Sequence, residues 1–178
     1  TTGAQSYGDA VTLGAATTLT STGSSVAMLG TVNGANTRAV NANTTATLSG
    51  GVGGGTPLTS VTVTAPSIVL GDVTTNGLQQ YNGNVLFNSS YLTNGSAFGV
   101  TGTTTVGSNS TITTGAGNVT LTGPVNSQTA QNNSLTINGV PLATLQAIFV
   151  DGGGVGTPED VTLNWTPDGS GGGTLTGS

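Results

Sequence analysis

Short runs in which an aliphatic side chain alternates with threonine recur along the whole chain. Typical runs are residues 17–20 (TTLT), 111–113 (TIT) and 119–121 (VTL), and glycine follows each of them within a few residues. A spacing of two is typical of a β-strand with one buried face, and glycine and asparagine suit the turns between such strands. No segment has the stripe of an amphipathic helix, so the pattern predicts an all-β chain of many short strands.

The chain also repeats itself over a longer distance. Three blocks recur in the same order: residues 1–13 match 74–87, residues 22–33 match 114–126, and residues 54–63 match 138–148. The first match places Tyr7 over Tyr81, and the third favours a strand at 142–150, where the local pattern fits helix and strand equally. We expect one β domain over residues 1–178, with repeats at about 1–73 and 74–150 and a partial third at 151–178.

The core predicted from this sequence is thin. Its apolar residues are mostly Val, Leu, Ile and Ala, beside one Trp, three Tyr and three Phe. Small inward residues, very short strands and internal repetition favour a parallel β-helix, also called a β-solenoid. Five Asn-Gly pairs are turn points that suit hairpins, and they favour the alternative, a β-sandwich of the pilin-like or immunoglobulin-like type.

Ionisable side chains are nearly absent from the chain. It has one Arg, no Lys, no His, no Cys and six acids, so the usual groups for acid–base or thiolate catalysis are scarce, and we do not expect an enzyme. The net charge of −5 and the missing lysines argue against nucleic acid or an anionic membrane as partner. No apolar run approaches about 18 residues, so we expect no membrane insertion. Because residue 1 is Thr, we expect a processed or excised chain.

Two segments resemble the β-strand repeats of giant bacterial surface adhesins of the filamentous-haemagglutinin-like and autotransporter-like type. They are TTGAQSYGDAVTLGAATTLTSTG and VNGANTRAVNANTTATLSGGVGGGTPLTSVTV, and the similarity covers most of residues 1–126. The resemblance implies a right-handed β-helix, secretion, and an extracellular or cell-surface role as adhesin, stalk or matrix fibre. It also implies surface glycans or a host or matrix protein as partners. It brings no catalytic residues, and these adhesins are far longer than this chain.

Four of the six acids lie near the C-terminal end of the chain. Asp151, Glu159, Asp160 and Asp168 are of the type that binds Ca²⁺, a hard cation that prefers carboxylate and carbonyl oxygens. The other interpretation is that these charges keep an exposed β edge soluble. Calcium is thus the one cofactor that the sequence suggests.

Thr-x-Thr triplets form another candidate binding surface. Stacked on neighbouring coils, such pairs would form the flat hydroxyl and methyl array of an ice-binding or glycan-binding solenoid; alternatively they are ordinary exposed strand positions. The tyrosines and Trp165 could stack on sugar rings or pack in the core. The triplets lie at residues 18–20, 62–64, 103–105, 111–113, 120–122 and 174–176.

The two ends of the predicted solenoid are candidates for self-association. Each end leaves strands without a neighbour, and the sequence has no evident capping helix there. We expect copies to stack head to tail, or to donate a strand to one another, and so to form a filament. The residues predicted to carry this contact are Val11 and Leu13 at one end and Val161, Leu163, Trp165 and Leu175 at the other.

Overall fold

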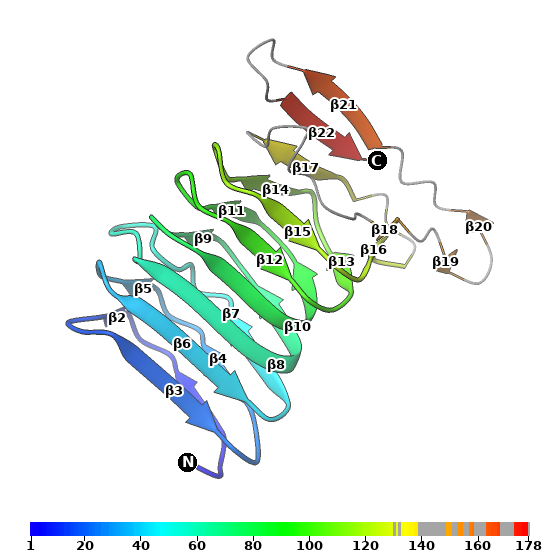
Figure 1. Ribbon diagram of the computed structural model, residues 1–178. Coiled ribbons are helices and arrows are strands. Elements are labelled where there is room, and N and C mark those ends of the chain that lie inside the picture. Colours follow the sequence, from blue (N-terminus) through cyan, green and yellow to red (C-terminus); the bar gives the residue numbers. More distant parts are fainter. Residues whose placement is uncertain are drawn as a thin grey trace.

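The structure is a computed structural model that describes residues 1–129, 131 and 133–138, together with the backbone of five later strands. These are β18 (Phe149–Val150), β19 (Gly153–Gly154), β20 (Thr157–Pro158), β21 (Leu163–Pro167) and β22 (Gly173–Gly177). The described residues form no helix, and their parallel strands stack as a β-solenoid of about six turns (Figure 1). The prediction of an all-β parallel solenoid is confirmed, and the β-sandwich alternative is wrong.

The turns, or coils, build three faces, with one strand per coil on each face except where the third coil adds to face 2 only the bridge residue Val52, which pairs with Val32 and Val73. Face 1 contains β1 (Gln5–Tyr7), β4 (Val26–Met28), β7 (Thr45–Leu48), the end of β8 (Ser60–Leu70), the end of β10 (Gln79–Phe87), β13 (Thr104–Val106), β16 (Pro124–Ser127) and β18. Face 2 contains β2 (Val11–Thr12), β5 (Val32–Asn33), β9 (Val73–Thr74), β11 (Ser90–Leu92), β14 (Ser110–Thr113) and β17 (Leu135–Asn138). Face 3 contains β3 (Thr17–Ser21), β6 (Thr37–Ala42), the start of β8, the start of β10, β12 (Phe98–Val100) and β15 (Val119–Leu121).

Strands of one face pair in parallel with their counterparts on the next coil. Along face 1 the register runs Gln5 to Val26 to Ala46, and along face 2 it runs Val11 to Val32. The coils differ in length. Ile68 pairs with Val85, 17 residues later, whereas Ile112 pairs with Ile137, 25 residues later. The pairing of β8 with β10 accommodates one extra residue as a bulge between Asn82 and Asn84.

The interior is one continuous column of inward side chains. Alternation in each strand turns every second residue inward, as in β4, where Val26 and Met28 are buried and Ala27 is not. Most of the column is Val, Leu, Ile and Ala, as the composition predicted. One stretch of the column holds four buried aromatic rings with centroids 4.6–5.8 Å apart: Tyr81, Phe87, Tyr91 and Phe98.

The long sequence repeat does not coincide with the structural repeat. Tyr7 lies on face 1 in register with Met28, whereas Tyr81 lies on face 3 in register with Val63 and Val100. The two tyrosines therefore occupy different faces of the coil. The reason is that the part of a strand that lies on one face is short and carries so few inward side chains that segments from different faces look alike in sequence.

The four fully described Asn-Gly pairs mark corners rather than hairpins, and the fifth, at 138–139, lies partly outside the described residues. Asn94 and Gly95 both have positive φ, at 49° and 95°, and their turn joins β11 on face 2 to β12 on face 3. Gly83 lies inside β10, at the bend where this strand passes from face 3 to face 1. A turn with positive φ redirects the chain, but here it leads to the next face and not back along the same sheet.

The last described strands depart from the parallel pattern. β22 pairs antiparallel with β17, and β21 pairs antiparallel with β22. Of the predicted strand at residues 142–150, only Phe149–Val150 is described, and it pairs parallel with β16; residues 142–148 lie outside the described residues. The antiparallel pair of β21 and β22 therefore extends face 2 beyond β17 with residues of the same chain.

Gly83 provides a test of the bend in β10. It has a φ of 149°, and a Cβ at this position would collide with the carbonyl oxygen of Ala65 on the coil below. We expect Gly83→Ala to lower the free energy of unfolding by about 2–5 kcal/mol, from strain and overpacking together. Gly14→Ala is the matched control, because a Cβ there meets nothing within 4 Å, and it should stay within about 0.5 kcal/mol of the parent in denaturant titrations. Equal effects of the two changes would contradict this account of the bend.

Candidate functional site

The first coil, β1 to β3, has a backbone edge with no neighbouring strand among the described residues. Gln5 N donates to Ser25 O at 3.0 Å and Val11 N donates to Thr31 O at 2.7 Å, so these residues point toward the second coil. In a parallel sheet successive residues point their N–H and C=O groups to opposite sides. Ser6 and Thr12 therefore direct theirs away from the stack. We call this surface of β1, β2 and β3 the open end.

Apolar side chains at the open end are only partly covered. Tyr7, Val11 and Leu19 pack against the core but stay half-buried, because no coil of the described residues lies over them. Leu13 is 5% exposed and belongs to the core itself. Of the two predicted association residues at this end, Val11 thus lies on the surface of the open end and Leu13 lies beneath it.

The first residue covers one corner of the open end. The Thr1 ammonium donates to Thr20 O at 3.0 Å, and Thr22 N donates to Thr1 O at 2.9 Å. The Gln5 side chain also donates to Thr20 O, at 2.7 Å. These bonds satisfy the last part of β3, and they leave β1, β2 and the start of β3 uncovered.

Arg38, the only arginine of the chain, lies in β6 of the second coil, next to β3 of the first coil. Its side chain points inward, in register with Thr17 and Val61, and is 3% exposed. Nη2 donates to Met28 Sδ at 3.0 Å, and Nε has no hydrogen-bond partner. Burial lowers the pKa of Arg38, and its interaction with Tyr7 on the first coil opposes that shift.

Arg38 was not among the predicted site residues. The signal that could have found it is the alternation of Arg38, Val40 and Ala42 in the segment TRAVNA, which places all three on one side of a strand. This segment lacks the regular threonine of the other runs. The alternation of aliphatic residues with threonine therefore does not identify this segment as a strand.

The predicted residues at the other end of the chain are only partly described. Leu163, Trp165 and Leu175 lie in the backbone of β21 and β22, where Trp165 is opposite Leu175. Val161 and the candidate calcium ligands Asp151, Glu159, Asp160 and Asp168 lie outside the described residues. Within the described part of the chain, no three acids, histidines or cysteines gather into a group that could hold a metal ion.

The Thr-x-Thr triplets do not stack into a regular array. Three of them, at 18–20, 62–64 and 120–122, share face 3, but other residues interrupt the outward rows between them. One row reads Thr18, Ala39, Thr62, Gln80, Gly99 and Thr120 from coil to coil. In the other row amides bridge the threonines, as where Asn41 donates to Thr20 at 3.4 Å and Asn82 donates to Thr64 at 3.2 Å.

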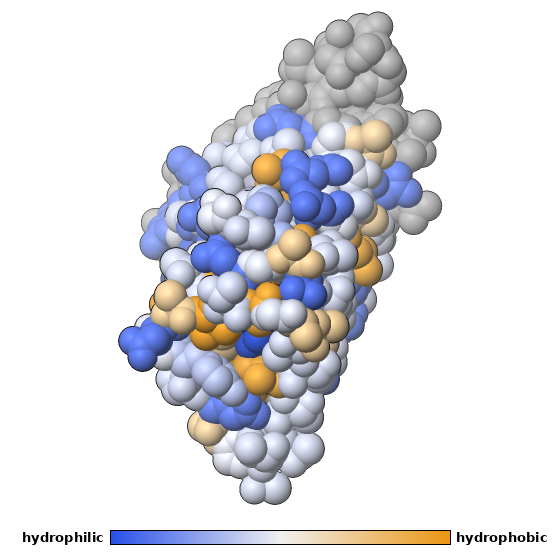
Figure 2. Space-filling model, turned by 90° about the vertical axis from the view of Figure 1, so that its left-hand side faces the viewer, coloured by the Kyte–Doolittle hydropathy of each residue, from blue (hydrophilic) through white to orange (hydrophobic). Residues whose placement is uncertain are grey.

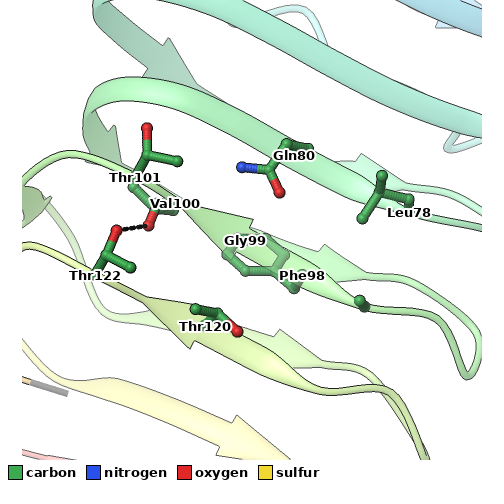
Figure 3. A pocket seen from close by; sticks show the side chains of 9 residues that line it. Leu78, Gln80, Phe98, Gly99, Val100, Thr101, Thr120 and Thr122 are labelled. Atoms are coloured by element: carbon green, nitrogen blue, oxygen red, sulfur yellow. Dashed lines mark hydrogen bonds between the residues drawn. The ribbon is translucent and has the colours of Figure 1, made fainter. Parts of the chain in front are cut away.

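A shallow hollow of about 210 Å³ lies on face 3 where Gly99 interrupts the outward row. Figure 3 shows Gln80 on one side of Gly99 and Thr120 on the other, with Leu78 and Thr101 at the rim. Thr122 Oγ1 donates to Val100 O at 2.9 Å, whereas the hydroxyls of Thr101 and Thr120 make no hydrogen bond within the described part of the chain. The hollow thus offers free hydroxyl groups and a small apolar patch.

Two of the four predicted sugar-stacking aromatics lie in the core. Tyr81 and Tyr91 are buried, and Tyr81 donates to Gln79 Oε1 at 3.0 Å. The Gln79 amide in turn donates to Val73 O at 3.1 Å and Leu92 O at 2.8 Å, so this buried polar network is satisfied. Burial raises the pKa of both tyrosines above the usual value of 10, well above it for Tyr81.

These pKa shifts predict a loss of stability in alkaline solution. A tyrosine whose folded pKa is raised contributes fully below its unfolded pKa of about 10 and loses that contribution as the pH rises further. We expect the free energy of unfolding to fall by about 1.4 kcal/mol per pH unit above 10 for each of Tyr81 and Tyr91. Thermal melts from pH 8 to 11.5 measure this, and the double variant Tyr81→Phe/Tyr91→Phe should flatten the curve. A parent curve that stays flat to pH 11.5 would refute it.

Comparisons with known proteins add no relative: no protein-family model, no curated protein and no solved structure matches the chain. A search of the described residues for a helix long and apolar enough to cross a membrane found none.

Proposed function

We propose that this protein is an extracellular structural or adhesive element that associates head to tail into a surface fibre. The observation that carries the proposal is the open end, where Ser6 and Thr12 present unpaired backbone groups beside the half-buried Tyr7, Val11 and Leu19. Such an edge is a template for a further strand. A partner that adds strands there satisfies the backbone and covers the apolar side chains in one step.

The geometry of the coils supports a fibre over a closed dimer. All strand pairs from β1 to β18 are parallel, so a neighbour that continues this pattern brings the far end of its own stack to the open end. Such a contact joins two different surfaces. A heterologous contact of this kind repeats without closing unless its rotation closes a ring.

The outer surface is compatible with a place at the cell surface. The chain has 4% charged residues, and Figure 2 shows a side dominated by residues of intermediate hydropathy with a few apolar ones near the middle. Threonine, serine, glycine and asparagine make up most of this surface. The resemblance to the repeats of bacterial surface adhesins points in the same direction.

Proline at the open edge tests the proposal. Ser6→Pro/Thr12→Pro removes two outward N–H groups and leaves the hydrogen bonds to the second coil intact, so the monomer should fold. We expect the association constant to fall about 10-fold or more, for two lost hydrogen bonds. Sedimentation velocity over a concentration series, with electron microscopy of the concentrated sample, measures this.

The matched control is Ser6→Val/Thr12→Val, which alters the same side chains and keeps both N–H groups. It should associate like the parent chain. The proposal fails if the parent chain stays monomeric at high concentration, or if the proline variant forms fibres as readily as the valine control.

Glycan binding on face 3 is a second candidate, and the hollow at Gly99 is the observation that favours it. The free hydroxyls of Thr101 and Thr120, the Gln80 amide and the apolar Leu78 offer the mixture of polar and apolar contacts that sugar rings use.

Removing the two hydroxyls tests this candidate. Thr101→Val/Thr120→Val keeps the shape of the hollow, and we expect it to weaken glycan binding by about 5-fold or more, since each lost hydrogen bond contributes about 1 kcal/mol. Thr18→Val, on the same face but far from the hollow, is the control for a glycan-array measurement. Equal binding by all three chains would exclude the hollow as the site.

A further inference from the structure

Arg38 is the feature of this structure that the proposed fibre leaves unexplained. It is the only Lys or Arg of the chain, and the fold places it in the interior, 3% exposed. A buried guanidinium is strongly unfavourable unless it is paired and hydrogen-bonded. A chain with so few charges would have many exposed positions for an arginine.

The surroundings of Arg38 do not compensate its charge. A guanidinium has five N–H donors. Here Nη2 meets a thioether sulfur, which is a weak acceptor, and Nε meets no acceptor among the described residues. Asp9 and Asp72, the two acids among the described residues, form no ion pair with it: Asp72 instead accepts hydrogen bonds from Ser89 and from Ser90 N. The group lacks an anionic partner in this part of the chain.

Arg38 also lies at the right depth to meet a partner that docks on the open end. On the side of β6 that faces the open end lies β3, with Thr17 in register with Arg38. Tyr7 is close enough to influence the pKa of Arg38. Tyr7 and Leu19 of the first coil are themselves only half-buried. One incompletely packed coil therefore separates the guanidinium from the docking surface.

The acids of the chain are distributed in a complementary way. Four of its six carboxylates, Asp151, Glu159, Asp160 and Asp168, fall within 18 consecutive residues near the C-terminal end, whereas the single side-chain cation is at residue 38. The described strands β18 and β21 lie at the end of the stack opposite the first coil, so head-to-tail stacking brings them to the open end of the neighbouring copy. Complementary charges of this kind fix the register and direction of an interface.

We infer that Arg38 is the anchor of the fibre contact and receives a carboxylate from the acidic segment 151–168 of a second copy. This inference rests on the proposed fibre and adds its recognition chemistry. The carboxylate enters between the half-buried side chains of the first coil and accepts hydrogen bonds from the guanidinium, including its unpartnered Nε. An arginine suits this role because its planar fork binds a carboxylate through two parallel hydrogen bonds.

Arg38→Met tests the anchor. Methionine fills a similar volume without the charge, so we expect the monomer to be as stable as the parent or more stable, as judged by its melting temperature. Association should nevertheless weaken by at least about 30-fold, because the docked carboxylate loses its partner. A merely structural arginine would give the opposite pattern, with a less stable monomer and unchanged association.

A second variant leaves both Arg38 and the first coil untouched. Asp151→Asn/Glu159→Gln/Asp160→Asn/Asp168→Asn neutralises the acidic segment, and it should associate as weakly as Arg38→Met. An equal mixture of the two variants then provides the sharpest measurement, by sedimentation velocity. The intact acids of one variant can dock on the intact Arg38 of the other, but no further junction forms, so we expect dimers and no fibres.

The outcomes separate this inference from the fibre itself. If the parent chain does not associate, the proposed function fails, and the inference fails with it. If the parent forms fibres and Arg38→Met forms them equally well, the anchor is wrong and the fibre stands. If Arg38→Met weakens the contact and the acid-neutralised variant does not, the acidic segment is not the partner. A mixture that stays monomeric would also overturn the pairing.

Discussion

The hydrogen bonds between coils are the constraint on which the rest of this structure depends. A β-strand cannot satisfy its own backbone hydrogen bonds, so each coil relies on the parallel strands of its neighbours. The register of three faces at once forces inward side chains to stack on one another, as Val26, Ala46 and Ile68 do on face 1. It also forces the corners to be tight, which is why Gly83 stands where β10 bends past the Ala65 carbonyl.

The same arrangement makes the interior demanding for polar groups. Gln79 shows how such a group is accommodated, because its amide bonds to backbone oxygens at a corner and its carbonyl accepts the Tyr81 hydroxyl. Arg38 shows the contrary case, with a guanidinium held near a thioether and an Nε without an acceptor. The contrast identifies Arg38 as a residue whose position the packing of a single chain does not account for.

The coils are held together by hydrogen bonds along the axis of the stack, so a coil at either extremity keeps backbone N–H and C=O groups without a partner on one side. At the first coil, Thr1 covers the end of β3, and the backbone of β1 and β2 stays exposed beside Tyr7 and Val11. On face 2, the other extremity is extended by β22 and β21 in antiparallel order. The two extremities therefore differ, and this difference gives the proposed fibre a direction.

Much of the fold was readable from local pattern. The alternation in segments such as TIT and VTL sets which side of a strand is buried, and the scarcity of large and charged side chains limits the core to a thin column; both follow from residue type alone. The sequence could not show that Asn82-Gly83 bends a strand to another face, that Tyr7 and Tyr81 lie on different faces, or that the Thr-x-Thr triplets are separated by Ala39 and Gln80. These depend on which strand stacks on which, and coils of 17 to 25 residues shift that register in ways that no single strand records. The burial of Arg38 depends on the same stacking. The segment TRAVNA alternates, but only the coils on both sides of it make it a strand whose inward side chains include a charged one.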